Sequence, residues 1–257
     1  MQPLPGYSAC IAKCRTAWSG ANAPRYPPMK KQKFTDLPTY LSLVADAEKN
    51  DLILFRGQSR NYPLLPSIAR KDPSQDTIDI ERKMFSELRR RGEMFLGAVP
   101  IDDWDMAVHA QHFGMATRLL DWTSNPLVAL WFACALAHKD ENSFVYVFNV
   151  KDEYLLNRAT DPDPFKRTKT RVFRPKLNNN RIVAQSGWFT AHKHSKSAGK
   201  FVALNINPDL TSAVTQVEVA HEIRSSLLTQ LNILGVNYQT MFPDMEGLCK
   251  HINWLHE

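Results

Sequence analysis

The sequence predicts an α+β fold in which helices are inserted between the strands of a mixed or antiparallel sheet. Three observations favour this class. A clear strand, Phe144–Val150, follows a strongly apolar helical segment. Further short strand-like runs gather after residue 180. The regular alternation of strand and helix that a doubly wound sheet requires is missing. With 257 residues, 44% of them apolar, the chain has enough material for one large core.

Helical segments are recognised by apolar residues that recur on one face and by signals at their ends. Pro126 suits the first turn of a helix that Ser124 or Asn125 would cap. Gly114 and Gly235 are typical helix stops. We predict helices over residues 38–49, 77–95, 104–113, 126–137, 221–234 and 244–255.

Strands are predicted where β-branched and aromatic residues run together. Asp51–Arg56 has the composition of a short buried strand, and Gly57 stops it. Two prolines make residues 61–67 irregular. The expected strands cover residues 51–56, 144–150, 181–191, 200–206 and 214–219, and residues 117–121 are expected to form a strand or an extended turn.

Residues 1–33 are predicted to be an N-terminal tail of a single domain that spans residues 34–257. The tail contains the run Ala-Pro-Arg-Tyr-Pro-Pro, which cannot continue a helix because proline lacks a donor and restricts its neighbour. A short helix is expected near Ser8–Trp18. The segment is either a flexible tail or one that orders against a partner protein.

We expect a cytoplasmic protein without a membrane span. The chain lacks the roughly eighteen consecutive apolar residues that a membrane helix needs, and its start does not resemble a secretory signal. Cys10 and Cys14 have no second pair at ligand spacing, so no metal site is predicted. Cys134 stands in an apolar run, which predicts a buried, reduced thiol.

Positive charge is concentrated between residues 166 and 200. The net charge is +6, and a stripe of this kind commonly binds phosphates. The alternative is a solvated loop with ordinary lysines. Trp188 flanks the stretch, where its ring could stack on a base. The residues predicted to contact nucleic acid are Lys166, Arg167, Lys169, Arg171, Arg174, Arg181 and Trp188.

Arg56 is the first candidate for a working residue, because it ends an apolar strand and precedes a glycine. Its planar guanidinium suits a phosphate or carboxylate, and Gly57 would let the backbone approach a ligand closely. In the alternative interpretation Arg56 clamps a neighbouring loop carboxylate such as Asp121.

Three stretches of the sequence resemble the FRG family. The first is Phe55-Arg56-Gly57-Gln58, followed by Leu65-Pro66-Ser67. The second is Gln111-His112-Phe113-Gly114, with the run from Thr117 to Pro126 and Ala129-Leu130-Trp131-Phe132-Ala133. The third is Arg181 with the run Ala184-Gln185-Ser186-Gly187-Trp188-Phe189-Thr190. The resemblance extends over nearly everything except the tail.

The same layout is similar to that of the ADP-ribosyltransferases. Their aromatic-Arg-Gly strand holds NAD through its arginine, and a short strand precedes an apolar helix, as Leu120–Thr123 does here. This likeness implies a split β core and NAD as cofactor. Those enzymes use a glutamate on a late strand to stabilise positive charge in the transition state. This chain has Gln185 there, whose amide could bond a ribose hydroxyl but carries no charge, and Asp121, Glu218 and Glu246 are the candidates for the negative charge.

The implied catalytic residues are Arg56, Asp121 and Gln185. His112 and Arg118 flank the same loop, although His112 is also consistent with a structural histidine and Arg118 with an ion pair to Asp121. Trp122 would stack on a ring of the cofactor or else belong to the core. The predicted NAD contacts are Arg56, Gly57, Gln58, His112, Arg118, Trp122 and Thr123.

The resemblance implies an NAD-dependent ADP-ribosyltransferase that acts as a toxin or antiviral effector. The acceptor is nucleic acid, with RNA favoured, or protein, and an antitoxin or another regulatory protein is an expected partner. The alternative is a module that binds nucleic acid or nucleotides without chemistry. Gln185 in place of a carboxylate favours that alternative.

Overall fold

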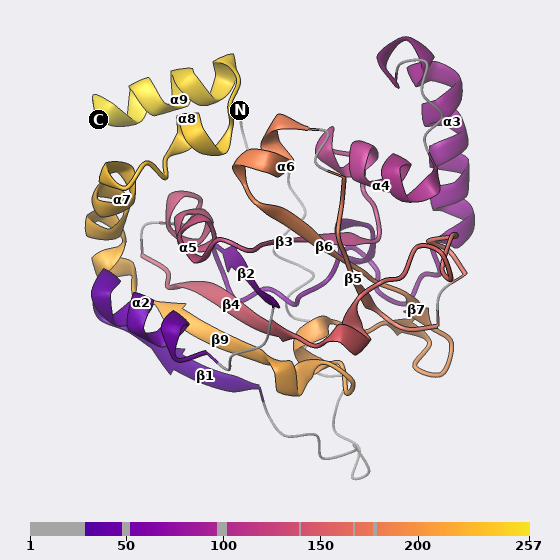
Figure 1. Ribbon diagram of the computed structural model, residues 1–257, viewed down its shortest axis with the longest axis horizontal. Coiled ribbons are helices and arrows are strands. Elements are labelled where there is room, and N and C mark those ends of the chain that lie inside the picture. Colours follow the sequence, from indigo (N-terminus) through magenta and orange to yellow (C-terminus); the bar gives the residue numbers. More distant parts are fainter. Residues whose placement is uncertain (1–28, 48–51, 97–101, 139, 167, 177–178) are drawn as a thin grey trace.

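The computed structural model describes residues 29–47, 52–96, 102–138, 140–166, 168–176 and 179–257. Its centre is a seven-stranded sheet in the order β1-β9-β4-β2-β3-β6-β5 (Figure 1). A small hairpin of β7 (His194–Ser195) and β8 (Lys200–Phe201) stands apart from it. The strands of the large sheet are β1 (Lys30–Lys33), β2 (Leu52–Gln58), β3 (Leu119–Thr123), β4 (Ser143–Val150), β5 (Arg171–Phe173), β6 (Gly187–Ala191) and β9 (Val214–Val219).

The sheet consists of two halves that meet at one residue pair. In one half β2 and β9 run antiparallel to β4, and β1 pairs with β9 in parallel. In the other half β6 runs antiparallel to both β3 and β5. Between β2 and β3 only Phe55 and Thr123 are in register. Beyond that pair the two strands are no longer joined by a ladder, and we call this place the β2–β3 split.

The helices gather at two ends of the sheet (Figure 1). In the view of Figure 1, α5, α7, α8 and α9 lie to the left, whereas α3 and α4 lie at the upper right. A 3-10 turn, η1 (Ser67–Ala69), precedes α3. The helices of the described residues are α2 (Leu37–Ala45), α3 (Ile78–Leu96), α4 (Asp103–His112), α5 (Pro126–Ala135), α6 (Asn180–Ala184), α7 (Arg224–Ile233), α8 (Tyr238–Met241) and α9 (Met245–Leu255).

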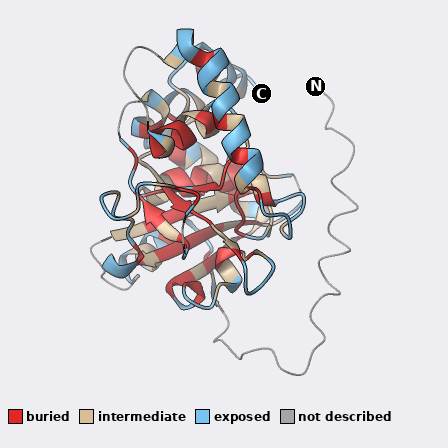
Figure 2. Ribbon diagram, turned by 90° about the vertical axis from the view of Figure 1, so that its right-hand side faces the viewer, coloured by how far each residue is buried: buried red, intermediate tan, exposed pale blue. Residues whose placement is uncertain are grey.

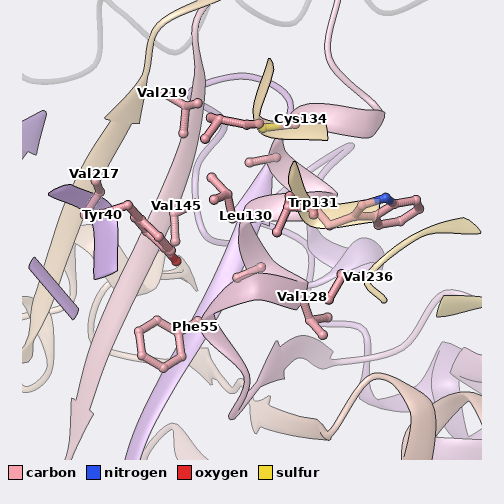
Figure 3. Close-up of a cluster of buried hydrophobic side chains, with 14 of the residues drawn as sticks. Tyr40, Phe55, Val128, Leu130, Trp131, Cys134, Val145, Val217, Val219 and Val236 are labelled. Atoms are coloured by element: carbon pink, nitrogen blue, oxygen red, sulfur yellow. The ribbon is translucent and has the colours of Figure 1, made fainter. Parts of the chain in front are cut away.

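Helix α5 forms the centre of the core on one face of the sheet. The Asn125 side chain accepts the main-chain N–H of Leu127, and Pro126 occupies the first turn, as the sequence predicts. Figure 3 shows side chains of α5 among those of β2, β4 and β9. Buried Cys134 is a free thiol there, as predicted, and burial raises its pKa to about 12.

Two further clusters complete the interior. One lies on the other face of the sheet and includes Leu54, Tyr146 and Trp122. The other packs α3 and α4 against β3, β5 and β6 through Phe85 and Trp104. The strands are largely buried, whereas α3 is exposed along most of its outer side (Figure 2).

The α+β prediction is confirmed, and most predicted elements lie within a few residues of their expected positions. The strand predicted at 181–191 is wrong in its first half. Residues Asn180–Ala184 form helix α6, because the Asn179 side chain caps it by accepting the Arg181 N–H at 2.8 Å. Ser186 then turns with a φ of 47° before β6 begins at Gly187.

The strand predicted at 200–206 is also wrong beyond Phe201. Leu204–Ile206 is a 3-10 turn whose start is fixed by the Leu204 N–H, which donates to the Leu64 carbonyl. Strands β1 and β5 and helix α8 were not predicted. Strand β1 falls inside the segment assigned to the N-terminal tail, and its polar Lys-Lys-Gln-Lys sequence has no strand pattern. Cys10, Cys14 and the helix expected at 8–18 lie outside the described residues.

No helix in the described part of the chain is long and apolar enough to cross a membrane.

Candidate functional site

Arg56 lies at the β2–β3 split. Strand alternation turns Phe55 and Gly57 toward α5, whereas Leu54, Arg56 and Gln58 face the other side of the sheet. The Arg56 side chain is largely buried, at 15% exposure. The prediction that Arg56 ends this strand and that Gly57 stops it is wrong, because β2 continues to Gln58, which pairs with Phe144 of β4.

One amino group of Arg56 donates a hydrogen bond, whereas the opposite edge of the guanidinium has no hydrogen-bond partner among the described residues. Nη1 donates to the main-chain carbonyl of Asp121 at 2.6 Å, and the Asp121 carboxylate lies 3.7 Å from the same atom. Because the ladder between β2 and β3 ends at Phe55, the Asp121 carbonyl accepts its hydrogen bond from the Arg56 side chain instead of from the main chain of β2. Nε is buried without a partner, and Nη2 makes no hydrogen bond to the described residues. Nε and Nη2 form the edge that binds oxyanions through two parallel hydrogen bonds.

The electrostatics of Arg56 leave it charged at neutral pH. Burial lowers the pKa of Arg56 to about 10, and the nearby Asp121 carboxylate opposes this shift. The guanidinium of Arg70, on the turn after η1, lowers it further because the two groups carry like charge. An anion bound at the free edge would relieve both effects.

Asp121 presents a carboxylate beside this arginine. Its side chain is 59% exposed, and Gln111 Nε2 donates to Oδ1 at 2.8 Å. The Thr117 hydroxyl in turn donates to Gln111 Oε1. Gln111 therefore fixes the orientation of Asp121. The sequence motif contains Gln111, but nothing in its spacing pointed to this contact.

Arg118 is occupied, which corrects its assignment to NAD. The side chain is 2% exposed and bonds Glu81 of α3 through Nε at 3.1 Å and Nη2 at 2.7 Å. Its Nη1 donates to the Pro164 carbonyl at 3.2 Å. The expected ion pair with Asp121 is also wrong, because Glu81 is the partner. Sequence reasoning missed it because Glu81 lies 37 residues earlier.

Trp122 and Thr123 belong to the interior, which corrects their assignment to the cofactor. The Trp122 ring is 3% exposed and packs on Phe148, and its indole N–H donates to the Thr190 hydroxyl at 3.0 Å. The Thr123 hydroxyl accepts the Asn125 N–H at 3.0 Å just before α5. In this structure neither side chain offers a ligand a free surface.

Gly57 serves the packing of α5 rather than the approach of a ligand. A Cβ at this position would lie 2.0 Å from the Ala129 carbonyl oxygen and 2.5 Å from the Ala133 nitrogen. Gln58 is 8% exposed on the Arg56 face, and its Oε1 is buried without a partner.

Gln185 does not lie on a strand, contrary to the prediction. It ends α6, and its Nε2 donates to the Met241 carbonyl at 2.9 Å. The two other carboxylates considered are also engaged. Glu218 pairs with Lys33 at 3.2 Å, and Glu246 pairs with Lys250 at 2.6 Å. Of the candidate carboxylates, only Asp121 contacts Arg56.

His112 ends α4 and is half-buried. Burial lowers its pKa, and Arg181 and His109 lower it further, whereas Asp244 opposes the change. Its ring stands edge-on to Phe113 at 4.7 Å between centroids. These neighbours place His112 toward α6 and the start of α9.

The basic stretch is only partly available to a nucleic acid. Arg181 pairs with Asp244 at 2.7 Å, and the Arg171 side chain donates to the Thr170 carbonyl. The guanidinium of Arg174 stands 5.5 Å over the Trp188 ring. Lys166, Lys169 and Arg174 are exposed, and Arg167 lies outside the described residues.

The strand register aligns Arg56 with Trp188. Arg56 is opposite Tyr146 on one side, and the Phe55–Thr123 pair places Trp122 on the other. Trp122 is in turn opposite Trp188. The exposed Arg174 and the split therefore lie on the same face of the sheet.

Two cavities in the described part of the chain lie away from Arg56. One, of about 40 Å³, is lined by residues of α5, α7, α8 and α9, including Trp131 and His251. The other is lined by Lys33, Glu218 and their neighbours. Neither includes Arg56.

The family comparison matches the part of the chain that holds this split. Residues 51–142 match the family model described as FRG domain. Over these residues the chain is similar to the FRG domain. The match includes Arg56, Gln111 and Asp121, whereas Gln185 and the basic stretch lie beyond it. No curated protein and no solved structure matches the chain.

Proposed function

We propose that the FRG domain binds NAD and transfers its ADP-ribose to an acceptor. The observation that supports this most is the free Nε–Nη2 edge of Arg56 at the β2–β3 split, beside the exposed carboxylate of Asp121. A guanidinium edge suits the phosphates of NAD. A carboxylate nearby suits the positive charge that develops on the ribose as nicotinamide departs.

The residues fit this cofactor in two respects. The buried Nε of Arg56 lacks a partner, which a phosphate oxygen would supply. Asp121 is held by Gln111 without being covered, so its negative charge remains available. In the transfer the bond from ribose to nicotinamide breaks and a bond from ribose to an acceptor oxygen or nitrogen forms. The acceptor's proton is lost to solvent or to a nearby base.

RNA is the favoured acceptor in this proposal, with DNA and protein as the other classes. Arg174 and Trp188 offer a cation and a ring on the face that Arg56 occupies. A base stacked on Trp188 would have its phosphates beside Arg174. A role as a toxin or antiviral effector, restrained by a partner protein, completes the proposal.

A binding module without chemistry is the second candidate. Gln185 favours it, because this amide is bound to Met241 and supplies no negative charge. Such a module would use Arg56 in the same way. It would not need Asp121 as a charged group.

Transfer is tested with NAD labelled in its adenylate, offered with RNA, DNA and cell extract in turn. The proposal expects label on an acceptor, lost in Arg56→Ala and in Asp121→Asn. Arg89→Ala is the matched control, since Arg89 of α3 pairs with Asp103 of α4 and does not contact Arg56. Binding of NAD without any transfer by the wild type selects the second candidate. Transfer that survives in Arg56→Ala contradicts both.

A further inference from the structure

A chain of three polar side chains crosses the interior next to the split. The Trp122 indole N–H donates to the Thr190 hydroxyl oxygen at 3.0 Å, and the same oxygen lies 3.0 Å from His192 Nε2. Tryptophan can only donate, and the hydroxyl has a single proton. The hydroxyl oxygen has room to accept two hydrogen bonds, but the Thr190 proton has no acceptor among the described residues other than His192 Nε2. We therefore assign this proton to His192 Nε2, which places the histidine's own proton on Nδ1.

His192 stays neutral, so this assignment holds across the physiological range. The side chain is 1% exposed. Burial lowers the pKa of His192 to about 3, and the guanidiniums of Arg56 and Arg118 contribute to the shift. Arg56 is thus close enough for its charge to act on the imidazole.

The Nδ1–H of His192 is a buried donor without a partner. Arg56 Nε–H is a second one, and both side chains lie on the face of the sheet that carries Trp122. A buried donor without a partner destabilises the folded state. Arg56 lies beside Trp122 across the split, and Trp122 begins the hydrogen-bonded chain that ends at His192, so both donors belong to the same part of this face. An acceptor there would complete the hydrogen bonding of both.

The nearby charge favours an anionic acceptor. Glu81 neutralises Arg118, but Arg70 forms no ion pair among the described residues and acts on Arg56 as a like charge. Arg70 is exposed. Its Nε donates to the Leu65 carbonyl at 3.2 Å, and this bond orients the guanidinium. The split therefore carries more positive charge than Asp121 offsets.

We propose that His192 is a ligand-binding residue whose Nδ1–H, together with Arg56 Nε–H, binds an oxygen of a phosphate group. The identity of that group as a phosphate of NAD rests on the proposed function. The anion site itself does not. His192 lies outside residues 51–142, so the family match does not include it.

The first test is an NMR measurement of the imidazole nitrogens of His192 in the wild-type chain. The inference expects a neutral ring protonated on Nδ1. Addition of inorganic phosphate, and separately of pyrophosphate, should shift the Nδ1 signal and the Arg56 Nε signal together. A ring protonated on Nε2, or signals that neither anion moves, would overturn it, since the donor would then be satisfied by water alone.

Two variants at position 192 make the second test. The amide nitrogen of Asn reaches the place of Nδ1, whereas that of Gln reaches the place of Nε2. His192→Asn should keep pyrophosphate affinity within about threefold, and His192→Gln should weaken it by about tenfold or more. Denaturation midpoints report whether each variant folds. Equal affinities in two folded variants contradict the inference.

The outcomes separate this inference from the transferase proposal. Pyrophosphate binding that depends on His192, without label transfer from NAD, leaves the anion site standing and removes the transferase. Label transfer that depends on Arg56 but not on His192 supports the transferase and removes the anion site at His192.

Discussion

Arg56 and Gly57 act on opposite faces of β2. The arginine side chain reaches the β2–β3 split, where Nη1 meets the Asp121 carbonyl at 2.6 Å. The glycine admits α5, whose main chain would lie 2.0 Å from any Cβ there. Neighbouring residues of one motif thus serve two purposes, one for a ligand and one for packing.

Gly57→Ala should destabilise the fold. The added methyl group meets helix backbone, which cannot turn away as a side chain would, so we expect a loss of about 3 kcal/mol in the free energy of unfolding. Urea denaturation measures it. The control is Gly92→Ala in α3, where the nearest atom is a Leu88 methyl carbon at 3.4 Å. Since alanine favours helix, this variant should be neutral or stabilised. Equal losses in both would refute the packing explanation.

The sequence predicted Arg56 as a candidate anion-binding cation on a strand, but not the residues that surround it or the continuation of β2 to Gln58. The Trp122 ring is buried against Phe148 of β4, a strand that does not adjoin β3. Gln111 reaches Asp121 only because α4 ends beside β3. His192 directly follows β6, and its main-chain N–H donates to the Arg118 carbonyl. Contacts of this kind join residues far apart in the chain, so spacing does not reveal them.

At the scale of elements, α3 is held to β3 by an ion pair buried from water. Glu81 is 0% exposed and accepts hydrogen bonds from the Arg118 side chain, the Arg118 N–H and the Thr77 hydroxyl. The helix predicted over residues 77–95 corresponds closely to α3. The sequence did not predict α6, whose five residues are too few for a periodic pattern.

Removal of one partner of this pair should be costly. Glu81→Leu leaves the Arg118 charge buried alone, and we expect a loss of about 3–5 kcal/mol in unfolding free energy. The double variant Glu81→Leu with Arg118→Met should recover at least half of that loss, because no buried charge remains. Glu87→Gln is the control, since Glu87 pairs with Arg90 and Arg91 in solvent. A single variant as stable as the control would contradict this role.

At the scale of the whole molecule, the sheet is two halves joined by the Phe55–Thr123 pair. The α+β class was predictable from the spread of strands and helices. A split core was expected only from the resemblance to the ADP-ribosyltransferases, because register between distant strands is absent from local patterns. The split brings Arg56 and Asp121 together, and the row through Trp122 and Trp188 extends this face toward Arg174.

RNA binding should use this extended face. Affinity is expected to fall with added salt, and Arg174→Ala should reduce the slope of log affinity against log salt by about one. Lys176→Ala is the control, because this ammonium already pairs with Asp105 at 2.6 Å. Filter binding or fluorescence anisotropy at several salt concentrations gives the slopes. The same slope for all three proteins would show that Arg174 does not meet a phosphate.

Calorimetric titration of NAD into the wild type and Arg56→Lys tests the central claim most directly. Lysine keeps the positive charge but loses the Nε–Nη2 edge that stands free at the split. If that edge grips the phosphates, the Kd of the variant rises about tenfold or more, which corresponds to about 1.4 kcal/mol. An unchanged Kd, or a wild type that does not bind NAD, would contradict the account.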